Sequence, residues 1–306
     1  MQRAIPQRTN LILAIGFVSL NLFQFFYLPI LLEASPAWGF VLIPLALLTP
    51  PFWALAHEAI HGILFSDIRW NNLAGRLLFI LFGSPFYFLR FGHLVHHRYN
   101  RRPVDLDDLY DPRHESYPVR AAVYYFKLLG GTYVQEVLVP LLFWLPKKVS
   151  KGALERFMPS REASFVRVKR QAEAELIDDD AIHAALRVDT AAVYILFGIA
   201  FTGYGDAWWM LALALAARGF FVSFLDNLYH YGTKRDDVRY ALYPQTPSWL
   251  QRYMLNFNLH YMHHRHPKAP WTALGTLVER DGRRPDIGYF TAALRQLRGP
   301  IPYEGI

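Results

Sequence analysis

The sequence contains no cysteine among its 306 residues, which excludes disulfides, thiolate metal sites and a cysteine nucleophile. Charge is also scarce, because Asp, Glu, Lys and Arg together make up 19% of the chain, compared with about 25% in an average soluble protein. Hydrophobic residues supply 53% and aromatic residues 16%. With so few charges among so many apolar residues, we expect a large part of the chain to face lipid rather than water.

Long uncharged stretches begin near the N-terminus. Residues 11–32 carry no charge over 22 positions, enough for a helix rising about 1.5 Å per residue to cross a hydrocarbon core about 30 Å thick. A signal peptide has a shorter apolar region and a cleavage site of small residues, so we interpret this run as a mature helix. A second uncharged run, 39–56, follows a short connection. Three prolines should bend the helix that it forms: Pro44, Pro50 and Pro51.

A second pair of apolar stretches lies at 190–202 and 207–225, on either side of the turn sequence GYGD. The first reaches spanning length if its helix begins near Ile182. The second contains Arg218, and a charge at that depth faces either protein or a water-filled cavity, unless the true span is shifted. We therefore predict about four transmembrane helices, paired in two hairpins: 11–32 with 39–60, and 186–203 with 207–229.

Basic residues set the predicted orientation. The two loops inside the hairpins, 33–38 and 203–206, contain no Lys or Arg, so the positive-inside rule places them on the outer side. Two further apolar segments, 73–92 and 121–146, are interrupted by charges, and we interpret them as interfacial or re-entrant. The predicted fold is all-α, integral to the membrane, and a single domain. Its parts are the two hairpins, interfacial helices and a histidine-rich cytoplasmic cap at 62–185 and 230–306.

Ten of the 12 histidines lie in four short clusters. The pattern H-x-x-H-H occurs twice, and the sequence AHEAIHG contains H-E-x-x-H. On a helix, positions i, i+3 and i+4 share one face, so each triplet can aim three imidazoles at one point. His114 and His183 lie outside the clusters, and we expect no metal-binding role for them. The clusters are His57 with His61; His93, His96 and His97; His230; and His260, His263, His264 and His266.

The spacing of these clusters favours two metal ions. H-E-x-x-H by itself is the signature of zinc proteases, in which Glu58 would activate water. That interpretation leaves both triplets unexplained, and eight histidines are too many for one tetrahedral zinc. Two ions of higher coordination number fit better, and among the metals that imidazole suits, iron activates oxygen. We expect His266, which lies off the shared face and precedes Pro267, to stay outside the site.

The same residues resemble a known family. HEAIH, HLVHH and HYMHH, their order relative to two membrane hairpins, and the acidic stretch HHRYNRRPVDLDDLYDP are similar to the integral-membrane fatty acid desaturase and hydroxylase superfamily, the histidine-box di-iron enzymes. The resemblance covers residues 40–275. It implies two iron ions that use O2, held by nine histidine ligands: His57, His61, His93, His96, His97, His230, His260, His263 and His264.

The resemblance also implies roles beside the ligands. Family members carry an additional histidine after the fourth membrane helix, often with a nearby Asn, and His230 with Asn227 fits this pattern. Asp226 is a second candidate to hold a metal-bound water, because it lies four residues before His230 and Asn227 only three. Glu58 is expected to orient a histidine ring. The carboxylates of the acidic stretch either pair with Arg98, Arg101 and Arg102 or form a solvated face: Asp105, Asp107, Asp108 and Asp111.

Three functions remain open from the sequence. The first is an oxygen-dependent oxidoreductase: a fatty acid desaturase that introduces a double bond into a long chain, or a hydroxylase or ketolase acting on an alkane, fatty acyl chain or carotenoid. The second is an intramembrane zinc metalloprotease, and the third a non-catalytic metal or haem carrier, which would need ligands along a pore. The aromatic segment LLFILFGSPFYFLRFG could wall a narrow apolar tunnel, which favours desaturation. In contrast, NLYHYG also resembles the corresponding box of membrane alkane hydroxylases, and carotenoid ketolases share a similar first box.

The expected partners are inferred from the same considerations. The substrate is expected to be a long-chain acyl lipid or acyl thioester, bound among membrane lipids, and no nucleic acid is expected. No fused redox domain is visible in residues 276–306, so electrons must come from a separate protein of the ferredoxin, rubredoxin or small cytochrome type. The formal net charge of +7 suits an acidic donor or anionic lipid headgroups.

Overall fold

The computed structural model describes residues 4–235 and 237–303, and nearly all of their regular structure is helical. The exceptions are two pairs of short parallel strands, each strand only two residues long. These are β1 (Leu109–Tyr110) with β4 (Ile301–Pro302), and β2 (Pro244–Gln245) with β3 (Ile287–Gly288). The predicted all-α class is therefore essentially confirmed.

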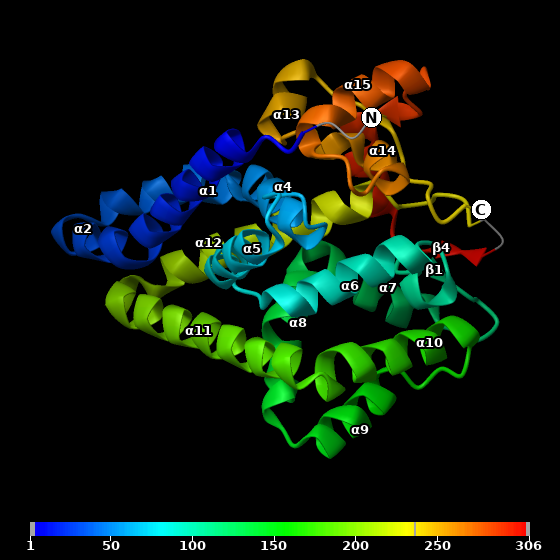
Figure 1. Cartoon of the computed structure of the whole chain (residues 1–306), viewed down its shortest axis with the longest axis horizontal. Coiled ribbons are helices and arrows are strands. Elements are labelled where there is room, and N and C mark those ends of the chain that lie inside the picture. Colours follow the sequence, from blue (N-terminus) through cyan, green and yellow to red (C-terminus); the bar gives the residue numbers. More distant parts are fainter. Residues whose placement is uncertain (1–3, 236, 304–306) are drawn as a thin grey trace.

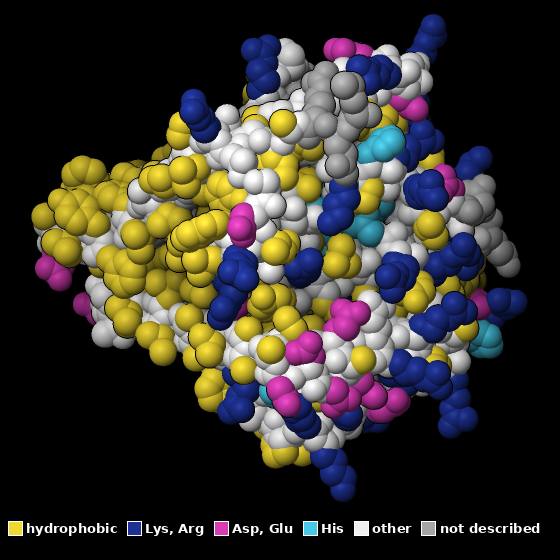
Figure 2. Space-filling view, in the orientation of Figure 1, with side chains coloured by type: hydrophobic (Ala, Val, Ile, Leu, Met, Phe, Trp, Pro, Cys, Tyr) yellow, Lys and Arg dark blue, Asp and Glu magenta, His cyan; other side chains and the backbone are white. Residues whose placement is uncertain are grey.

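The molecule has two chemically distinct ends. One end is a lobe of long helices, and Figure 2 shows that its visible surface is mostly hydrophobic. Lys and Arg gather on the opposite end, where the shorter helices lie (Figures 1 and 2). The lobe therefore has the surface that a bilayer requires. Its helices are α1 (Gln7–Leu22) and α2 (Leu28–Ala34), joined by a π-helical turn, together with α11 (Asp180–Tyr204) and α12 (Trp208–Leu228).

Three helical stretches are long and apolar enough to cross a membrane: Gln7–Ala34, Tyr117–Trp144 and Asp180–Leu228. The last comprises α11 and α12, which meet at a 3₁₀ turn (Gly205–Ala207). Two bent helix pairs raise the number to five if each is one span. Length and composition therefore allow three to five spans, a range that includes the predicted four.

The ends of the spanning helices match local sequence signals. The pair α3 (Leu42–Leu47) and α4 (Thr49–Ile60) is bent by 45° where prolines were expected to bend it. The 3₁₀ turn Pro36–Val41 precedes α3. Helix α11 begins at Asp180 because the carboxylate of Asp179 accepts the backbone N–H groups of Ala181 and Ile182. Helix α11 is 25 residues long. The apolar run 190–202, which is too short to span a membrane by itself, is therefore part of a helix of spanning length.

The segment expected to be re-entrant, 73–92, is sharply bent. Helices α5 (Ile68–Phe82) and α6 (Phe86–Tyr99) meet at 98°. Gly83 ends α5 with a φ of 108°, and the side chains of Tyr133 and Phe197 pack against it too closely for a Cβ atom. Only glycine fits this corner, and the bend suits a re-entrant hairpin better than a straight span.

The segment 121–146 was expected to be interfacial or re-entrant. Helices α7 (Tyr117–Phe126) and α8 (Thr132–Leu138) are joined by a π-helical turn, and a 3₁₀ helix (Val139–Trp144) extends α8. By length and composition the whole stretch could also span, so its position relative to the membrane stays a prediction. Its kink at Gly130, with a φ of 127°, packs against α12, where Gly219 leaves room for the backbone.

The charges within the apolar segments have partners in the protein. Arg76 of α5 forms a bidentate pair with Asp189 of α11, with a shortest N–O distance of 2.7 Å. Arg218 is 5% exposed and faces protein rather than lipid. It donates to the backbone oxygens of Leu81 and Phe82 at 2.9 and 3.0 Å, and to the side chain of Asn21 at 2.8 Å. These carbonyls lie at the C-terminal end of α5, where a cation is favoured.

The remaining helices build the charged end of the molecule, which we call the cap (Figure 1). Segments far apart in the sequence meet here, since β1 pairs with β4 near the C-terminus. The cap helices are α9 (Lys147–Phe157), α10 (Ala163–Ala172), α13 (Ser248–Tyr253), α14 (His260–Arg265), α15 (Trp271–Asp281) and α16 (Tyr289–Arg295).

Candidate metal centre

All nine histidines predicted as ligands converge in the structure, and they do so in two separate groups. Within each group, one ring nitrogen from every member lies within 4.8 Å of the others. The five-histidine group contains His57, His61, His93, His97 and His263. The four-histidine group contains His96, His230, His260 and His264.

Each histidine triplet divides between the two groups, which corrects the expectation that each would aim at one point. On a helix, residues four apart are separated by about 40° around the axis, whereas residues three apart are separated by about 60° in the opposite direction. The i, i+4 pair therefore stays together and the remaining member points elsewhere. In α6, His93 and His97 enter one group and His96 the other. In α14, His260 and His264 stay together while His263 joins the opposite group.

The first histidine pair lies at the end of α4, where the chain reverses. Gly62 follows His61 with a φ of 70°, a left-handed conformation that glycine adopts readily after a helix. The ammonium of Lys268 donates to the backbone oxygen of His61 at 2.6 Å. Asn71, which is fully buried, accepts from the backbone of Leu64 and donates to that of Ala59. These bonds fix the loop and with it the direction of both imidazoles.

His230 lies in the turn after α12, held by the stretch that follows the second triplet. Arg101 and Asp108, both 2% exposed, form an ion pair at 2.5 Å. The Asp108 carboxylate also accepts the backbone N–H of Gly232, and Arg101 donates to the backbone oxygen of Thr233. Arg101 adopts a φ of 64°, unusual for a non-glycine residue. This buried pair positions the turn and therefore His230.

The donor atoms fit metal ions better than a hydrogen-bonded cluster. The Nε2 atom of His93 lies 2.8 Å from that of His57, 3.0 Å from that of His61 and 2.9 Å from that of His97. A single imidazole nitrogen can make only one such hydrogen bond, either as donor or as acceptor. Three close nitrogen neighbours are therefore better explained by a group that could hold a metal ion than by shared protons.

The separations also indicate the coordination geometry. Two imidazoles at right angles around one ion, with bonds of about 2.1 Å, would place their nitrogens about 3.0 Å apart, and a tetrahedral pair about 3.4 Å. In the four-histidine group, the Nε2 atom of His230 lies 3.1 Å from those of His96 and His260. The Nε2 atoms of His260 and His264 are also 3.1 Å apart. The separations in both groups are nearer to the right-angle value than to the tetrahedral one.

Burial keeps the cap histidines in the form that binds metal. It lowers the pKa of His260, His263 and His264 well below the ordinary value, and neighbouring imidazoles lower it further. The pKa of His230 falls for the same reason. These rings are therefore neutral at physiological pH, with one nitrogen free to coordinate.

The acidic stretch after the second triplet provides specific partners rather than a solvated face. Asp105 accepts from Nδ1 of His96 at 2.9 Å, which turns the Nε2 atom of His96 toward His230. Asp107 pairs with Lys127 at 2.6 Å. Partial desolvation would raise the pKa of Asp107, whose side chain is 58% exposed, but the nearby ammonium outweighs this and holds the pKa below its ordinary value. The sequence analysis singled out these carboxylates but did not predict that Asp105 would be the hydrogen-bond partner of His96.

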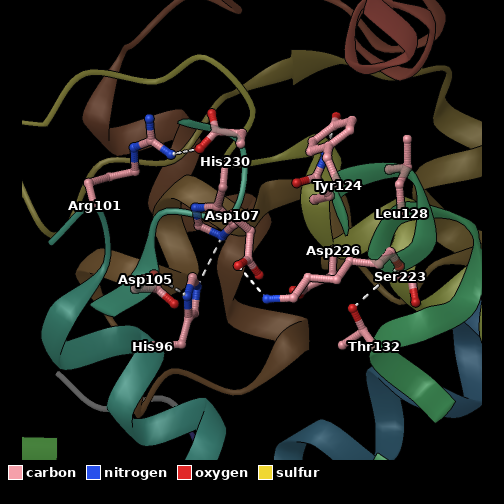
Figure 3. Close-up of a pocket in the computed structure, with 13 residues that line it drawn as sticks. His96, Arg101, Asp105, Asp107, Tyr124, Leu128, Thr132, Ser223, Asp226 and His230 are labelled. Atoms are coloured by element: carbon pink, nitrogen blue, oxygen red, sulfur yellow. Dashed lines mark hydrogen bonds and ion pairs between the residues drawn. The ribbon is translucent and has the colours of Figure 1, made fainter. Parts of the chain in front are cut away.

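A polar cavity of about 90 Å³ borders the four-histidine group. Figure 3 shows His96 and His230 pointing toward each other at its edge, with Asp105 beside His96. Asp226 lines the cavity, and no described residue donates a hydrogen bond to its carboxylate. Asn227 also lines it, but its amide donates to the Tyr124 hydroxyl at 3.2 Å and to Gln296 at 2.7 Å. Of the two candidates near His230, Asn227 is thus the one whose amide N–H groups are engaged elsewhere.

Other side chains near the site behave differently from their predictions, or were missed. The carboxylate of Glu58 accepts the backbone N–H of Trp271 at 3.1 Å, so it holds α15 against α4 rather than orienting a ring. Asn258 is fully buried, and neither of its amide atoms has a partner within the described chain. In the sequence, the only indication that Asn258 lies near the site was its position two residues before His260. Within the described residues, three histidines lie outside both groups: His114, His183 and His266.

Comparison with known proteins agrees with this geometry. Searches among curated proteins and among solved structures returned no match. A family model described as fatty acid desaturase matches residues 34–293. The matched range is most of the chain and contains both histidine groups and the helices that position them. The chain therefore belongs to the fatty acid desaturase family.

Proposed function

We propose that the protein is an oxygen-dependent desaturase that introduces a double bond into a long hydrocarbon chain, with one iron in each histidine group. The observation that carries the proposal is the set of convergent Nε2 atoms at 2.8 to 3.1 Å, which supports one cation in each group rather than shared protons. Membership of the family supports an oxidoreductase, and the apolar helices support a membrane protein. When bound, two irons would supply the oxidising power to break an unactivated C–H bond with O2.

The chain's own residues hold and shape the site. The nine imidazoles bind the ions, and Asp105 keeps His96 directed at the four-histidine group. Trp53 and Phe257 pack against His57, with ring centroids 6.4 and 5.2 Å away, so this side of the site is apolar. In the overall reaction the hydrocarbon loses two hydrogens, and O2 becomes two waters with two electrons from a donor and two protons from solvent. The polar cavity beside His96 and His230 suits the entry of water and protons.

Desaturation and hydroxylation begin with the same loss of one hydrogen and differ in the second step. The loss of a second, neighbouring hydrogen gives a double bond, and transfer of oxygen gives an alcohol. How firmly the cavity holds the chain decides between them. The apolar, aromatic wall on the His57 side supports desaturation. A hydroxylase or ketolase acting on an alkane, acyl chain or carotenoid uses the same centre and is the second candidate, which the NLYHYG box supports.

The direct test is expression in a host that makes only saturated lipids. We expect a new monounsaturated chain that depends on O2 and disappears in a His263→Ala variant, and about two irons per chain in the purified protein. If the products carry oxygen, as an alcohol or ketone, the protein is a hydroxylase rather than a desaturase, and the proposed metal site is unaffected. One zinc per chain with no iron dependence would reject the di-iron proposal and reopen the metalloprotease.

The proposed arrangement also includes a side of the membrane and an electron donor. We place the histidine groups on the cytoplasmic side, where a separate protein of ferredoxin, rubredoxin or small cytochrome type delivers electrons. Reporters fused after Glu33 and Gly205 should read as external, and those after Asn100 and Lys169 as cytoplasmic. An external reading at Lys169 would mean that Tyr117–Trp144 crosses the membrane.

A further inference from the structure

We propose that the substrate chain enters sideways from the bilayer, through an apolar groove between α3 and α12. The inference rests on the proposed oxidation of a hydrocarbon chain and names the source of that chain: a lipid already resident in the membrane, rather than a thioester delivered from water.

The groove has the chemistry of a hydrocarbon site. Its volume is about 440 Å³, and every residue that lines it is apolar or glycine. Its α12 wall is a helical stripe of residues spaced at i, i+4, i+7 and i+11: Met210, Ala214, Ala217 and Phe221. Large side chains on the rim are exposed, among them Phe40 at 73% and Leu213 at 61%. Small residues along the wall and large ones at the rim leave a channel wide enough for an alkyl chain.

The groove opens toward lipid rather than water. One wall comes from α12, part of the apolar stretch Asp180–Leu228, and the other from the bent pair that begins at Pro36. No charged side chain lines it, so the phosphates of a thioester carrier would find no cation here. A lipid acyl chain is the molecule that reaches such a surface within a bilayer.

The inner end of the groove continues toward the histidines. Phe221 lines the groove and also a second, small cavity of about 10 Å³ between α4 and α12. Trp53 and Phe257 line that second cavity and pack against His57 of the five-histidine group. Asp226 lines it as well and borders the polar cavity beside the four-histidine group. Phe221 is thus shared by the lipid-facing groove and by the small cavity whose residues Trp53 and Phe257 pack against His57.

The test fills the groove without touching the metal site. Ala217→Phe places a bulky ring in the wall, and Ala216→Phe puts the same ring on the preceding residue, which is exposed and does not line the groove. The assay uses nanodiscs that contain saturated phosphatidylcholine as the substrate. We expect Ala217→Phe to lower the oxidation of this lipid by at least about tenfold, because the added ring fills the groove and keeps the acyl chain away from the histidine groups. Ala216→Phe should convert like the unchanged protein. Iron content should be equal in all three.

A binding measurement accompanies the activity assay. A phosphatidylcholine with a diazirine on its acyl chain should label the α12 peptide in the unchanged protein and in Ala216→Phe, and lose that labelling in Ala217→Phe. Equal labelling of all exposed helix faces, together with full activity of Ala217→Phe, would mean that only annular lipid fills the groove, and would overturn the proposal.

Two further outcomes separate this inference from the proposed function. If the unchanged, iron-loaded protein converts lipid and Ala217→Phe converts it equally well, lateral entry fails and the desaturase stands. Lateral entry also fails, and the desaturase again stands, if a water-soluble acyl thioester is converted and the lipid is not. If the iron-loaded protein oxidises no hydrocarbon at all, the proposed function fails, whatever the labelling shows.

Discussion

The two histidine groups use the same type of ligand in different surroundings. The five-histidine group lies against Trp53 and Phe257, and apolar residues cover that side, although Phe257 also contacts His260 of the other group. The four-histidine group borders a polar cavity lined by several carboxylates, and one of its rings is held by Asp105. Since both groups share the helices α6 and α14, the difference comes from the residues that pack around the rings rather than from the rings themselves.

This asymmetry suggests a division of work between the two sides. A hydrocarbon can approach on the apolar side without desolvating any polar group, whereas water and protons can reach the polar side. The helical spacing favours the division, because the i+3 member of each triplet lies on the opposite side of position i from the i+4 member. One folded scaffold therefore presents two histidine groups with unlike neighbours.

The largest expected effect comes from removing one ligand in each group. His93→Ala and His260→Ala should each abolish activity and lower the iron content from about two to about one per chain, since the two groups share no ligand. Iron analysis of purified protein measures this directly. If either change removes both ions, the groups bind cooperatively, and their comparison as independent sites breaks down.

A smaller effect should distinguish the groups through Asp105. Asp105→Asn removes the carboxylate that orients His96, and we expect a loss of about 10- to 100-fold in iron retention or activity, limited to the four-histidine group. Asp107→Asn is the matched control, because its partner is Lys127 and not a histidine. Chelator challenge of the iron-loaded protein should release one ion early in Asp105→Asn, and Asp105→Glu should restore its retention. Early release from Asp107→Asn would argue against a specific role of Asp105.

The sequence predicted the composition of the site better than its arrangement. The spacings of His57 with His61 and of both triplets selected eight of the nine residues that converge, and the family resemblance supplied the ninth, His230. The division of His96 from His93 is a consequence of helix geometry and could have been derived at that stage. In contrast, the pairs Arg76–Asp189 and Arg101–Asp108 join α5 to α11 and fix the turn of His230, and such tertiary partners leave no periodic signal in the chain.

The prediction of membrane-spanning helices from the sequence was limited for the same reason, because tertiary partners cannot be read from the chain. Charges within the stretches 73–92 and 121–146 were taken as evidence against spanning helices, but Arg76 has a protein partner that makes it compatible with a buried position. Arg218, in a stretch that was predicted to span, is buried with protein partners in the same way. Whether a charged helix lies in or on the membrane depends on such partners, which come from elsewhere in the chain. The stretch Tyr117–Trp144 is therefore apolar enough to span despite its three charges, Arg120, Lys127 and Glu136.

A third prediction addresses the support that the two groups share. Arg218 holds the end of α5 and thereby the hairpin that carries α6, which supplies ligands to both groups. Arg218→Leu leaves the oxygens of Leu81 and Phe82 without their donor, and should lower the free energy of unfolding by about 2–4 kcal/mol. The thermal midpoint should fall while iron is lost equally from both groups. Arg187→Leu, on an exposed face of α11, is the control and should change the midpoint little.

The smallest effect is expected at Asn227, which the resemblance to known enzymes placed beside the metal. Its amide donates to Tyr124 and Gln296, so it joins α12 to α7 and to the C-terminal segment after α16. Asn227→Ala should therefore cost about 1–2 kcal/mol of stability, through two lost hydrogen bonds, and leave the iron in the four-histidine group as firmly bound as before. Thermal unfolding and chelator release, measured on the same samples, separate the two effects.

Asp226→Asn is the matched comparison, because it keeps the side-chain size and changes the carboxylate that lines the polar cavity. We expect Asp226→Asn to lower activity without lowering stability, the reverse of Asn227→Ala. If Asn227→Ala instead releases iron early and unfolds normally, Asn227 acts on the metal, and the four-histidine group has a neighbour that its hydrogen bonds do not reveal.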